Sequence, residues 1–545
     1  MKFSHLLLIL GLMITFSCEE KQKTGIETSK EEEAVVIKKL ASADLIAKRF
    51  PASSNSFGNI EPQYTDLLDS IYSEREYKPI WTDRALREDL YRSIERAKED
   101  GLEPEDYHLS YLKKSLANLS ELDDEERSLT EIILTDAFFS LASDYNSGKL
   151  DPKEIYSIWG IESNKIDLPG LLDHGVQQNN ILAAIDSVVP KHEVYKGLKR
   201  SLKEYRELAE NEKDPIFISE EGESIKADEK DERIPNIKRR LIQLGYWENK
   251  IADSLNIYDE SLQEAVKEFQ EKYGIETDGV IGGGTIKTLN KTYQDRLEQI
   301  LVNLERWRWY PKDLGEQYII VNIANYRLHL VKGEDTLATH RTMVGTEARK
   351  TPVFSDEVEH IVYNPTWTIP PTIKSKDVIP SASKDPGYIN RKNFSIFNRK
   401  GQKMNPQEVN WASSEVNSYT FRQEAGPTNP LGLVKIIYPN QYLIYLHDTP
   451  SKSLFKKNIR AQSSGCVRVQ GALELAKILL DDQLKYDDEN IQEIINSGKT
   501  TTIKVTKNIK VHHLYWTAWN ENGSTRFAED VYKRDAAIYK LLTKN

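Results

Sequence analysis

The sequence is poor in cysteine, with only Cys18 and Cys466 among 545 residues. Two cysteines exclude a disulfide-stapled scaffold, and without an HExxH or a paired CxxC motif we expect no metal site and no cofactor. Positive charge is in deficit, because 74 Lys and Arg are outnumbered by 85 Asp and Glu, which gives a net charge of −11. Phosphate binding needs a basic surface, so we expect no nucleic-acid partner.

The sequence also lacks an apolar run long enough to cross a membrane, which takes about 20 residues. The run from Leu6 to Phe16 has eleven residues and follows Lys2, as in a secretory signal. It ends in 15–18, TFSC, which resembles a bacterial lipobox. We therefore expect residues 1–17 to be a signal peptide, Cys18 to carry a lipid, and residues 18–35 to form a charged tether. The alternative is an ordinary signal peptide followed by a coincidental cysteine.

The N-terminal part of the remaining chain has the periodicity of helices. Apolar residues recur at helical spacing over 86–97, before a stop at Gly101, and again over 129–142. A stretch rich in Glu, Asp and Lys follows at 210–233 and is typical of a solvated connector. These patterns predict a helical scaffold domain with an acidic connector over residues 36–233, and they show no catalytic constellation.

A compact helical module is predicted over residues 234–292. One helix should end at Gly245, and a second carries apolar residues at 262, 265, 266 and 269. The strings 265–270, AVKEFQ, and 278–282, DGVIG, resemble the peptidoglycan-binding repeat of many cell-wall enzymes. The alternative is a small structural module that acts only as a spacer.

The sequence changes to a β-rich pattern after a connector at 293–316. Strands are expected at 318–322, 327–331, 358–363, 433–438 and 441–447, with a helix at 471–480. We assign residues 317–500 to one β-rich domain and residues 501–545 to a helical tail that packs on the scaffold. The expected fold class is multidomain α+β.

One histidine and one cysteine in the β-rich region form a candidate catalytic pair. His447 ends the strand predicted at 442–447, on the same face as Leu443 and Tyr445. Cys466 follows nineteen residues later. A thiol needs a base or a nearby positive charge to act as a nucleophile near neutral pH, and a histidine is the usual base.

The residues around Cys466 could complete an acyl-transfer site. Gly465 allows close approach of a substrate, and the backbone amides of Ser464, Gly465 and Cys466 could face a developing oxyanion. Arg468 lies on the same face as Cys466 if the chain is extended, and could hold a substrate carboxylate. Spacing alone leaves open that Cys466 is merely a buried cysteine and His447 a strand-end histidine.

A resemblance to a known family favours the catalytic reading. The strings 444–450, IYLHDTP, and 463–469, SSGCVRV, resemble the signature of L,D-transpeptidases with a YkuD-type catalytic domain, most of all the YcbB-like subfamily. Many family members have a histidine before the Gly-Cys pair, whereas Ser464 stands there, as is usual in that subfamily. Further similar stretches extend over nearly the whole mature chain, among them 351–355, 364–371, 384–388, 426–432 and 515–519.

The resemblance implies a mechanism without metal or nucleotide. Cys466 would form a thioester with a tetrapeptide stem of peptidoglycan and release D-Ala, while His447 moves the proton. A second stem would then accept the acyl group, giving a 3–3 cross-link. Tyr445 and Arg468 would shape the site or hold substrate, Trp367 and Asn429 could line the groove, and the stretch from about 380 to 425 could cover it. The family is typically acylated by carbapenems.

The resemblance also implies a setting and its rivals. We expect a lipoprotein of the cell envelope that faces the periplasm and has donor and acceptor stems, the membrane and other cell-wall synthesis enzymes as partners. With water as acceptor, the same site would be an L,D-carboxypeptidase. The remaining alternative is a non-catalytic lipoprotein that tethers the wall.

Overall fold

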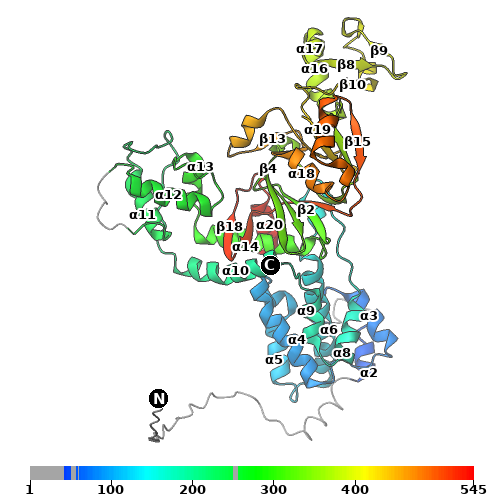
Figure 1. The fold of residues 1–545 in the computed structure, drawn as a ribbon. Coiled ribbons are helices and arrows are strands. Elements are labelled where there is room, and N and C mark those ends of the chain that lie inside the picture. Colours follow the sequence, from blue (N-terminus) through cyan, green and yellow to red (C-terminus); the bar gives the residue numbers. More distant parts are fainter. Residues whose placement is uncertain (1–41, 51–56, 59, 249–255, 545) are drawn as a thin grey trace, which may run out of the picture.

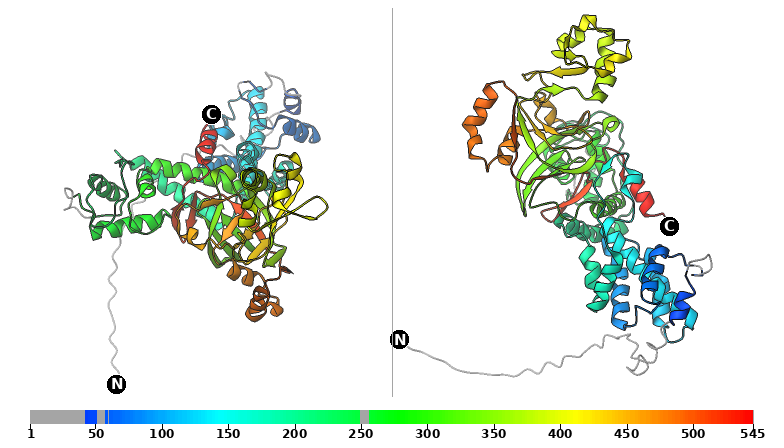
Figure 2. Two further views of the ribbon diagram at one scale, coloured as in Figure 1. Left: turned by 90° about the horizontal axis from the view of Figure 1, so that it is seen from above. Right: turned by 90° about the vertical axis from the view of Figure 1, so that its right-hand side faces the viewer.

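The computed structural model describes residues 42–50, 57–58, 60–248 and 256–544. A helical domain lies at one end of the molecule, a β-rich domain lies in the middle, and a small helical module projects to one side (Figure 1). A small α/β subdomain stands at the end farthest from the N-terminal helices, as both side views show (Figures 1 and 2). None of the described helices is both long and apolar enough to cross a bilayer. Cys18, the predicted signal and the predicted tether lie outside the described residues.

The scaffold is built around one long helix, α6 (Asp124–Ser147), which is buried along most of its length. A capping box starts it, since Asp123 and Glu126 each accept a backbone N–H of the other. The helices predicted at 86–97 and 129–142 are confirmed by α4 and α6. The other elements around α6 are α2 (Ala43–Ala47), α3 (Thr65–Glu74), α4 (Arg84–Arg96), η1 (Ala97–Asp100), η2 (Pro104–Tyr107), α5 (Leu109–Ala117), α7 (Pro152–Ile155), α8 (Leu168–Gln177) and α9 (Ile181–Val188).

Two packed helices connect the scaffold to the rest of the chain, α10 (Glu193–Asn211) and α14 (Tyr293–Trp309). The predicted connector at 293–316 is therefore largely helical. Arg308 on α14 is fully buried, pairs with Glu305 at 2.7 Å and donates to the Asp100 carbonyl at 3.0 Å. A buried charge must be paired and hydrogen-bonded to be tolerated, so this cluster fixes α14 against the scaffold.

The helical module consists of α11 (Ile234–Gln243), α12 (Glu260–Lys272) and α13 (Gly283–Leu289), as the sequence predicts. Gly245 has φ +78° just after α11, a conformation that glycine adopts without steric cost. Gln270 is buried and holds the following turn, because it accepts the Gly279 N–H at 2.9 Å and donates to the Val280 carbonyl at 3.0 Å. The acidic connector pairs with this module through a bridge between Ile225 and Ile281.

A twelve-stranded sheet forms the core of the β-rich domain, in the order β1-β5-β16-β2-β3-β4-β14-β12-β11-β6-β15, with β13 pairing with β4. One of its strands, β1, comes from the scaffold region, and two, β15 and β16, come from the C-terminal tail. The strands predicted at 318–322, 327–331, 358–363 and 433–438 are confirmed by β2, β3, β6 and β11, and the predicted helix by α18 (Ala472–Leu479). The strands up to β14 are β1 (Trp159–Gly160), β2 (Gln317–Asn322), β3 (Arg327–Lys332), β4 (Asp335–Gly345), β5 (Val353–Glu357), β6 (His360–Tyr363), β11 (Val434–Ile437), β12 (Leu446–His447), β13 (Ala461–Ser463) and β14 (Val467–Val469), and further helices are η3 (Glu347–Arg349), η7 (Lys452–Lys456), η8 (Leu484–Tyr486) and α19 (Asp488–Asn496).

Residues 367–423 form the small subdomain, with a sheet in the order β7-β10-β8-β9. It has its own apolar core, which includes Ile389, Ile396 and Phe421. A π-helix, η4 (Lys374–Val378), interrupts its helical part. π-Helices are rare in proteins, and those that occur often lie at functional sites. The other elements are β7 (Trp367–Thr368), α15 (Pro371–Ile373), α16 (Ile379–Lys384), α17 (Gly387–Arg391), β8 (Phe394–Phe397), β9 (Lys403–Met404), η5 (Pro406–Glu408), η6 (Ser414–Ser418) and β10 (Thr420–Gln423).

The C-terminal tail differs from the helical tail that the sequence predicts. Only α20 (Asp535–Leu542) is a helix in its described part, whereas β15 (Thr501–Lys504) and β16 (Lys510–Leu514) belong to the large sheet and β17 (Ala518–Glu521) pairs with β18 (Ser524–Phe527). Pairing with distant strands decides these residues: β16 lies between β5 and β2. The tail contacts α10 and α14, with Thr525 donating to Ser201 and Asp535 pairing with Arg306. The fold class, multidomain α+β, is confirmed.

Candidate functional site

Two short parallel strands, β12 and β14, bring the predicted catalytic residues to one place. His447 lies opposite Arg468 in this pair, and the Val467 N–H donates to the Tyr445 carbonyl at 3.2 Å. On the other side of β12, Lys435 of β11 lies opposite His447. Residues directly opposite in a sheet share a face, so Lys435, His447 and Arg468 form a row, with Cys466 two residues before Arg468.

The His447 ring is buried and held in one orientation. Its Nδ1 lies 2.5 Å from the Asp448 carbonyl oxygen. A carbonyl oxygen can only accept a hydrogen bond, so Nδ1 carries the proton and Nε2 keeps a free lone pair. Burial, with a contribution from the Arg468 charge, lowers the pKa of His447 to about 3. The imidazole is therefore neutral near pH 7 and can accept a proton at Nε2.

The Cys466 side chain is partly exposed, and its Sγ lies 3.6 Å from the Leu443 carbonyl oxygen as a donor. Burial raises the pKa of the thiol to about 11, although the amide and hydroxyl of Tyr445 and the charges of Lys435 and Arg468 act in the opposite direction. Within the described part of the chain, no hydrogen bond joins Sγ to the imidazole. Near pH 7 the thiol and the imidazole are therefore both neutral.

The strand predicted at 441–447 is wrong in extent, because only Leu446 and His447 are in β12. The Asn440 side chain accepts the N–H groups of Tyr442 and Ile444 and so folds the preceding residues into a turn. Leu443 consequently has φ +57° and is 60% exposed, so it does not share a face with His447. The turn has a consequence for the site, since it presents the Leu443 carbonyl to Cys466.

Tyr445 lies among the charged and titratable groups of the site. Its ring centroid is 5.5 Å from that of His447, and Lys435 Nζ lies 4.8 Å from the ring centroid. Burial, together with the Cys466 thiolate charge and hydrogen bond, raises the pKa of its hydroxyl well above 10, while a hydrogen bond with Trp367 lowers it. Tyr445 thus stays a neutral phenol that can donate a hydrogen bond to the sulfur.

Arg468 offers a buried donor without a partner. Its Nε has no hydrogen-bond acceptor among the described residues. Burial lowers the pKa of the guanidinium, and the nearby thiolate raises it. An unsatisfied buried donor costs about 1–3 kcal/mol, a cost that an incoming acceptor would remove. The position suits the carboxylate-binding role predicted for Arg468.

The three amides predicted to face an oxyanion are not equivalent. The Gly465 N–H donates to Ser463 Oγ at 3.1 Å, so it is already engaged. The N–H groups of Ser464 and Cys466 have no acceptor among the described residues. Gly465 has φ +122°, which favours glycine, and its carbonyl accepts a hydrogen bond from Thr351 Oγ1 at 2.7 Å.

Arg349 is a site residue that the motif analysis missed. Its guanidinium makes a two-pronged ion pair with Asp377 of the π-helix at 2.7 and 2.8 Å and donates to Ser464 Oγ at 3.0 Å. Arg349 therefore connects the small subdomain to the residues just before Cys466. Thr351 and Lys435 were likewise missed as site residues, although Thr351 stands inside a stretch that resembles the transpeptidase family and Lys435 inside a predicted strand.

The two residues considered for the groove have different places. Asn429 is fully buried; its Nδ2 donates to the carbonyls of Pro365 and Glu424, and its Oδ1 accepts the Leu431 N–H. With all these groups engaged, Asn429 supports the backbone and does not line a groove. Trp367, at the base of the small subdomain, lies close enough to the site to lower the pKa of Tyr445.

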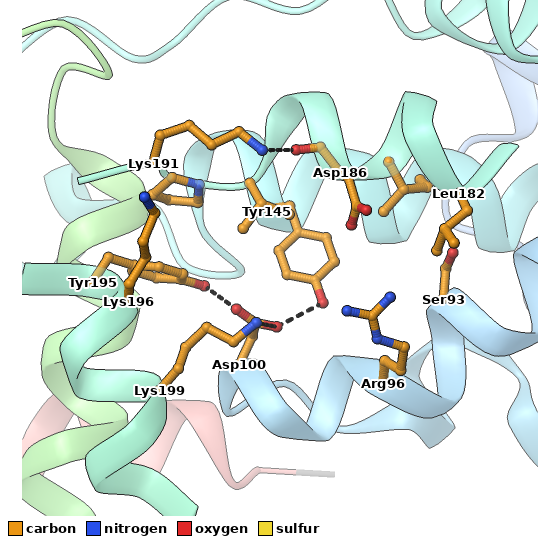
Figure 3. Close-up of a pocket in the computed structure, with 13 residues that line it drawn as sticks. Ser93, Arg96, Asp100, Tyr145, Leu182, Asp186, Lys191, Tyr195, Lys196 and Lys199 are labelled. Carbon is orange, nitrogen blue, oxygen red and sulfur yellow. Dashed lines mark hydrogen bonds and ion pairs between the residues drawn. The ribbon is translucent and has the colours of Figure 1, made fainter. Parts of the chain in front are cut away.

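A cavity of about 180 Å³ lies in the scaffold (Figure 3), and Cys466 is not among the residues that line it. Figure 3 shows Asp100 at its centre, where it accepts hydrogen bonds from Tyr145 and Tyr195 and pairs with Lys199 at 2.8 Å. Lys196 pairs with Glu193 on its own helix. Since these groups satisfy one another, the cavity is a feature of scaffold packing. The described residues contain no group of three or more His, Cys, Asp or Glu placed to hold a metal ion.

Three parts of the chain match known domain families. Residues 66–202 match the family described as "Scaffold domain", residues 230–289 match "Putative peptidoglycan binding domain", and residues 316–505 match "L,D-transpeptidase catalytic domain" (YkuD). A Haemophilus influenzae protein named "Putative L,D-transpeptidase" is 34% identical over 242 residues. These residues are 44% of this chain and 49% of that protein, so the chain spans about half the length of the curated relative.

Solved structures show more distant likenesses. An L,D-transpeptidase from Xylanimonas cellulosilytica is 13% identical, with coverage of 54% of this chain and 98% of that chain and a TM-score of 0.16. An L,D-transpeptidase (Yku) from Stackebrandtia nassauensis is 12% identical, with coverage of 56% and 98% and a TM-score of 0.21. TM-scores this low do not support a structural comparison, so the family assignment of the catalytic domain depends on the domain matches. The predicted resemblance is confirmed: the chain carries an L,D-transpeptidase catalytic domain of the YkuD family, joined to a scaffold domain and a peptidoglycan-binding domain in the YcbB-like arrangement.

Proposed function

We propose that this protein forms 3–3 cross-links in peptidoglycan by transferring a tetrapeptide stem through a thioester on Cys466. The observation that carries the proposal is the pairing of β12 with β14 inside the matched catalytic domain. It places a neutral imidazole with a free Nε2 on β12 and the thiol directly before β14, with two cations, Lys435 and Arg468, opposite His447 on the neighbouring strands.

The first half-reaction needs a proton transfer during attack. The thiol has a pKa of about 11, so only about one molecule in ten thousand is a thiolate near pH 7. His447 accepts the thiol proton at Nε2 as the sulfur turns from the Leu443 carbonyl toward the stem, and a carbon–sulfur bond forms at the third residue. The bond to the terminal D-Ala breaks, and His447 returns the proton to the departing amine.

The second half-reaction resolves the thioester. The side-chain amine of a second stem attacks the thioester carbonyl, a carbon–nitrogen bond forms, and the carbon–sulfur bond breaks. The proton lost by the amine returns to the sulfur through His447. Lys435 and Arg468 stabilise negative charge on the sulfur, and Arg468 Nε is available for the carboxylate of the donor stem. A backbone amide near Cys466 stabilises the tetrahedral oxyanion in both halves.

Product analysis tests the proposal. The full chain is incubated with purified tetrapeptide muropeptides, and we expect 3–3 dimers together with free D-Ala. Cys466→Ala should give neither product while keeping the thermal unfolding temperature of the wild type. Tripeptides without dimers would show an L,D-carboxypeptidase, and 3–3 dimers from Cys466→Ala would refute the nucleophile assignment.

We also propose that the protein is a lipoprotein of the cell envelope, anchored through Cys18 and facing the periplasm. The support is the apolar run at 6–16 followed by a cysteine. Metabolic labelling with an alkyne fatty acid should mark the wild type and leave Cys18→Ala unlabelled. Equal labelling of the two would refute the anchor.

A further inference from the structure

A tyrosine outside the matched catalytic domain connects to the chain beside the nucleophile. The match ends at residue 505, whereas Tyr532 belongs to the C-terminal tail. Its hydroxyl donates to the Gly345 carbonyl at 2.7 Å and accepts the Thr351 N–H at 3.0 Å. Tyr532 and Thr351 are both fully or almost fully buried, at 1% and 0% exposure.

Thr351 passes this connection on to the nucleophile loop. Its hydroxyl accepts the Gly345 N–H at 2.9 Å and donates to the Gly465 carbonyl at 2.7 Å. Gly345 can lie here only because it has no side chain, since an added Cβ would come within 2.1 Å of the Arg349 carbonyl oxygen. Tyr532, Gly345 and Thr351 thus form a closed hydrogen-bonded ring. The Thr351 hydroxyl of this ring donates outward to the Gly465 carbonyl.

The bond to the Gly465 carbonyl fixes the next amide as well. In a trans peptide the C=O and the following N–H point in opposite directions. The Gly465 carbonyl points to the buried Thr351, so the Cys466 N–H points away from that interior, and it has no acceptor among the described residues. The Gly465 N–H, in contrast, is engaged by Ser463.

We propose that Tyr532 and Thr351 are positioning residues that aim the Cys466 N–H at the oxyanion of the acyl-transfer reaction. The inference rests on the proposed function and deepens it, because it names the amide that acts and the residues that orient it. The tail itself is held from both sides: Tyr515 stacks on the Tyr532 ring at 5.5 Å, and the Arg534 guanidinium lies 4.1 Å from the ring centroid of Tyr156 in the scaffold. The scaffold and tail therefore support the oxyanion site from outside the catalytic domain.

The test separates two reactions of the same sulfur. Acylation by a carbapenem passes through a tetrahedral oxyanion, whereas alkylation by iodoacetamide displaces iodide at a saturated carbon and needs no oxyanion donor. Loss of one oxyanion donor costs about 10²–10³-fold in rate, so misorientation should cost somewhat less. Thr351→Val should slow acylation of the full chain about 10- to 100-fold and Tyr532→Phe about 3- to 10-fold, with alkylation within about twofold of the wild type.

Two buried positions supply matched controls. Thr342 Oγ1 and Tyr363 Oη have no hydrogen-bond partner among the described residues, so Thr342→Val and Tyr363→Phe should leave both rates unchanged. Circular dichroism confirms that each variant is folded, and Tyr532→Phe tests the proposal even if Thr351→Val does not fold.

The outcomes point in different directions. Wild-type acylation rates in both Thr351→Val and Tyr532→Phe would overturn the proposal. An equal loss of acylation and alkylation would also overturn it, because these residues would then position the Cys466 sulfur and not the Cys466 N–H. A wild-type chain that carbapenem does not acylate would overturn the proposed function and this inference with it.

Discussion

The most informative perturbation is His447→Gln. The substitution removes the group that accepts the thiol proton but keeps a side-chain amide that can donate to the Asp448 carbonyl, as Nδ1 does now. The expected result depends on the pKa values of the pair, about 3 for His447 and about 11 for Cys466. Between these values the wild type keeps one ionisation state, so its acylation rate should be nearly flat from about pH 5 to 9.

The variant should behave differently in size and in pH dependence. Without the base, the rate follows the thiolate fraction, which is about 10⁻⁴ at pH 7 for a pKa of about 11. General-base catalysis contributes roughly 10²–10⁴-fold, so we expect a loss of that size at pH 7. The remaining rate should then rise tenfold per pH unit until the pH approaches 11.

Carbapenem acylation followed by stopped-flow absorbance or intact mass, from pH 5 to 10, measures both profiles. His360→Gln is a suitable control, because His360 lies partly exposed on β6. A wild-type rate that itself rises tenfold per pH unit, or a variant as fast as the wild type at pH 7, would refute His447 as the base.

Three further predictions concern other contacts. Arg349→Gln and Asp377→Asn each remove the two-pronged ion pair between Arg349 and Asp377 and should raise KM. Tm should fall by no more than about 3 °C, because a partly exposed pair contributes about 1 kcal/mol or less to stability. An unchanged KM would contradict the role of this contact. Burial raises the pKa of Glu131 to about 7, so the contribution of this carboxyl to stability is present below pH 4 and is lost as pH rises through 7. Urea unfolding should therefore show Glu131→Gln gaining stability relative to the wild type between pH 5 and 8. A variant that loses stability relative to the wild type over this range would contradict the raised pKa. Gln270→Leu leaves backbone groups of the 279–280 turn unpaired, and each unpaired group should lower the stability by about 1–3 kcal/mol. Less of this variant should co-sediment with isolated cell walls. Undiminished stability would refute the structural role of Gln270.

Periodicity and turn residues predicted much of the fold. Helix α6 and strands β2 and β3 lie where apolar spacing places them, because their local preference and their burial agree. The tail was mispredicted because the residues of β16 become a strand only through pairing with β2 and β5, which are far away in sequence. Local pattern cannot reveal such a partner.

The candidate site was predictable to a similar extent. The sequence identified Cys466, His447, Tyr445 and Arg468, and the structure places them on the paired strands β12 and β14 or directly before them. The turn at 440–445 was missed, because the alternation of residues 442–447 resembles a strand while the side chain of Asn440 imposes the turn.

The supporting residues of the site were beyond what the sequence could show. Arg349, Thr351 and Tyr532 act through contacts that span more than a hundred residues of chain. No motif records such contacts, and only the folded structure brings these side chains to the nucleophile loop.

The most direct test of the central claim is the intact mass of the protein after incubation with a tetrapeptide stem and no acceptor. We expect the wild type to gain the mass of the stem minus its terminal D-Ala, and peptide mapping to place that mass on Cys466, with no adduct on Cys466→Ala. An unmodified wild type after free D-Ala has been released, or an adduct that persists in Cys466→Ala, would contradict the account.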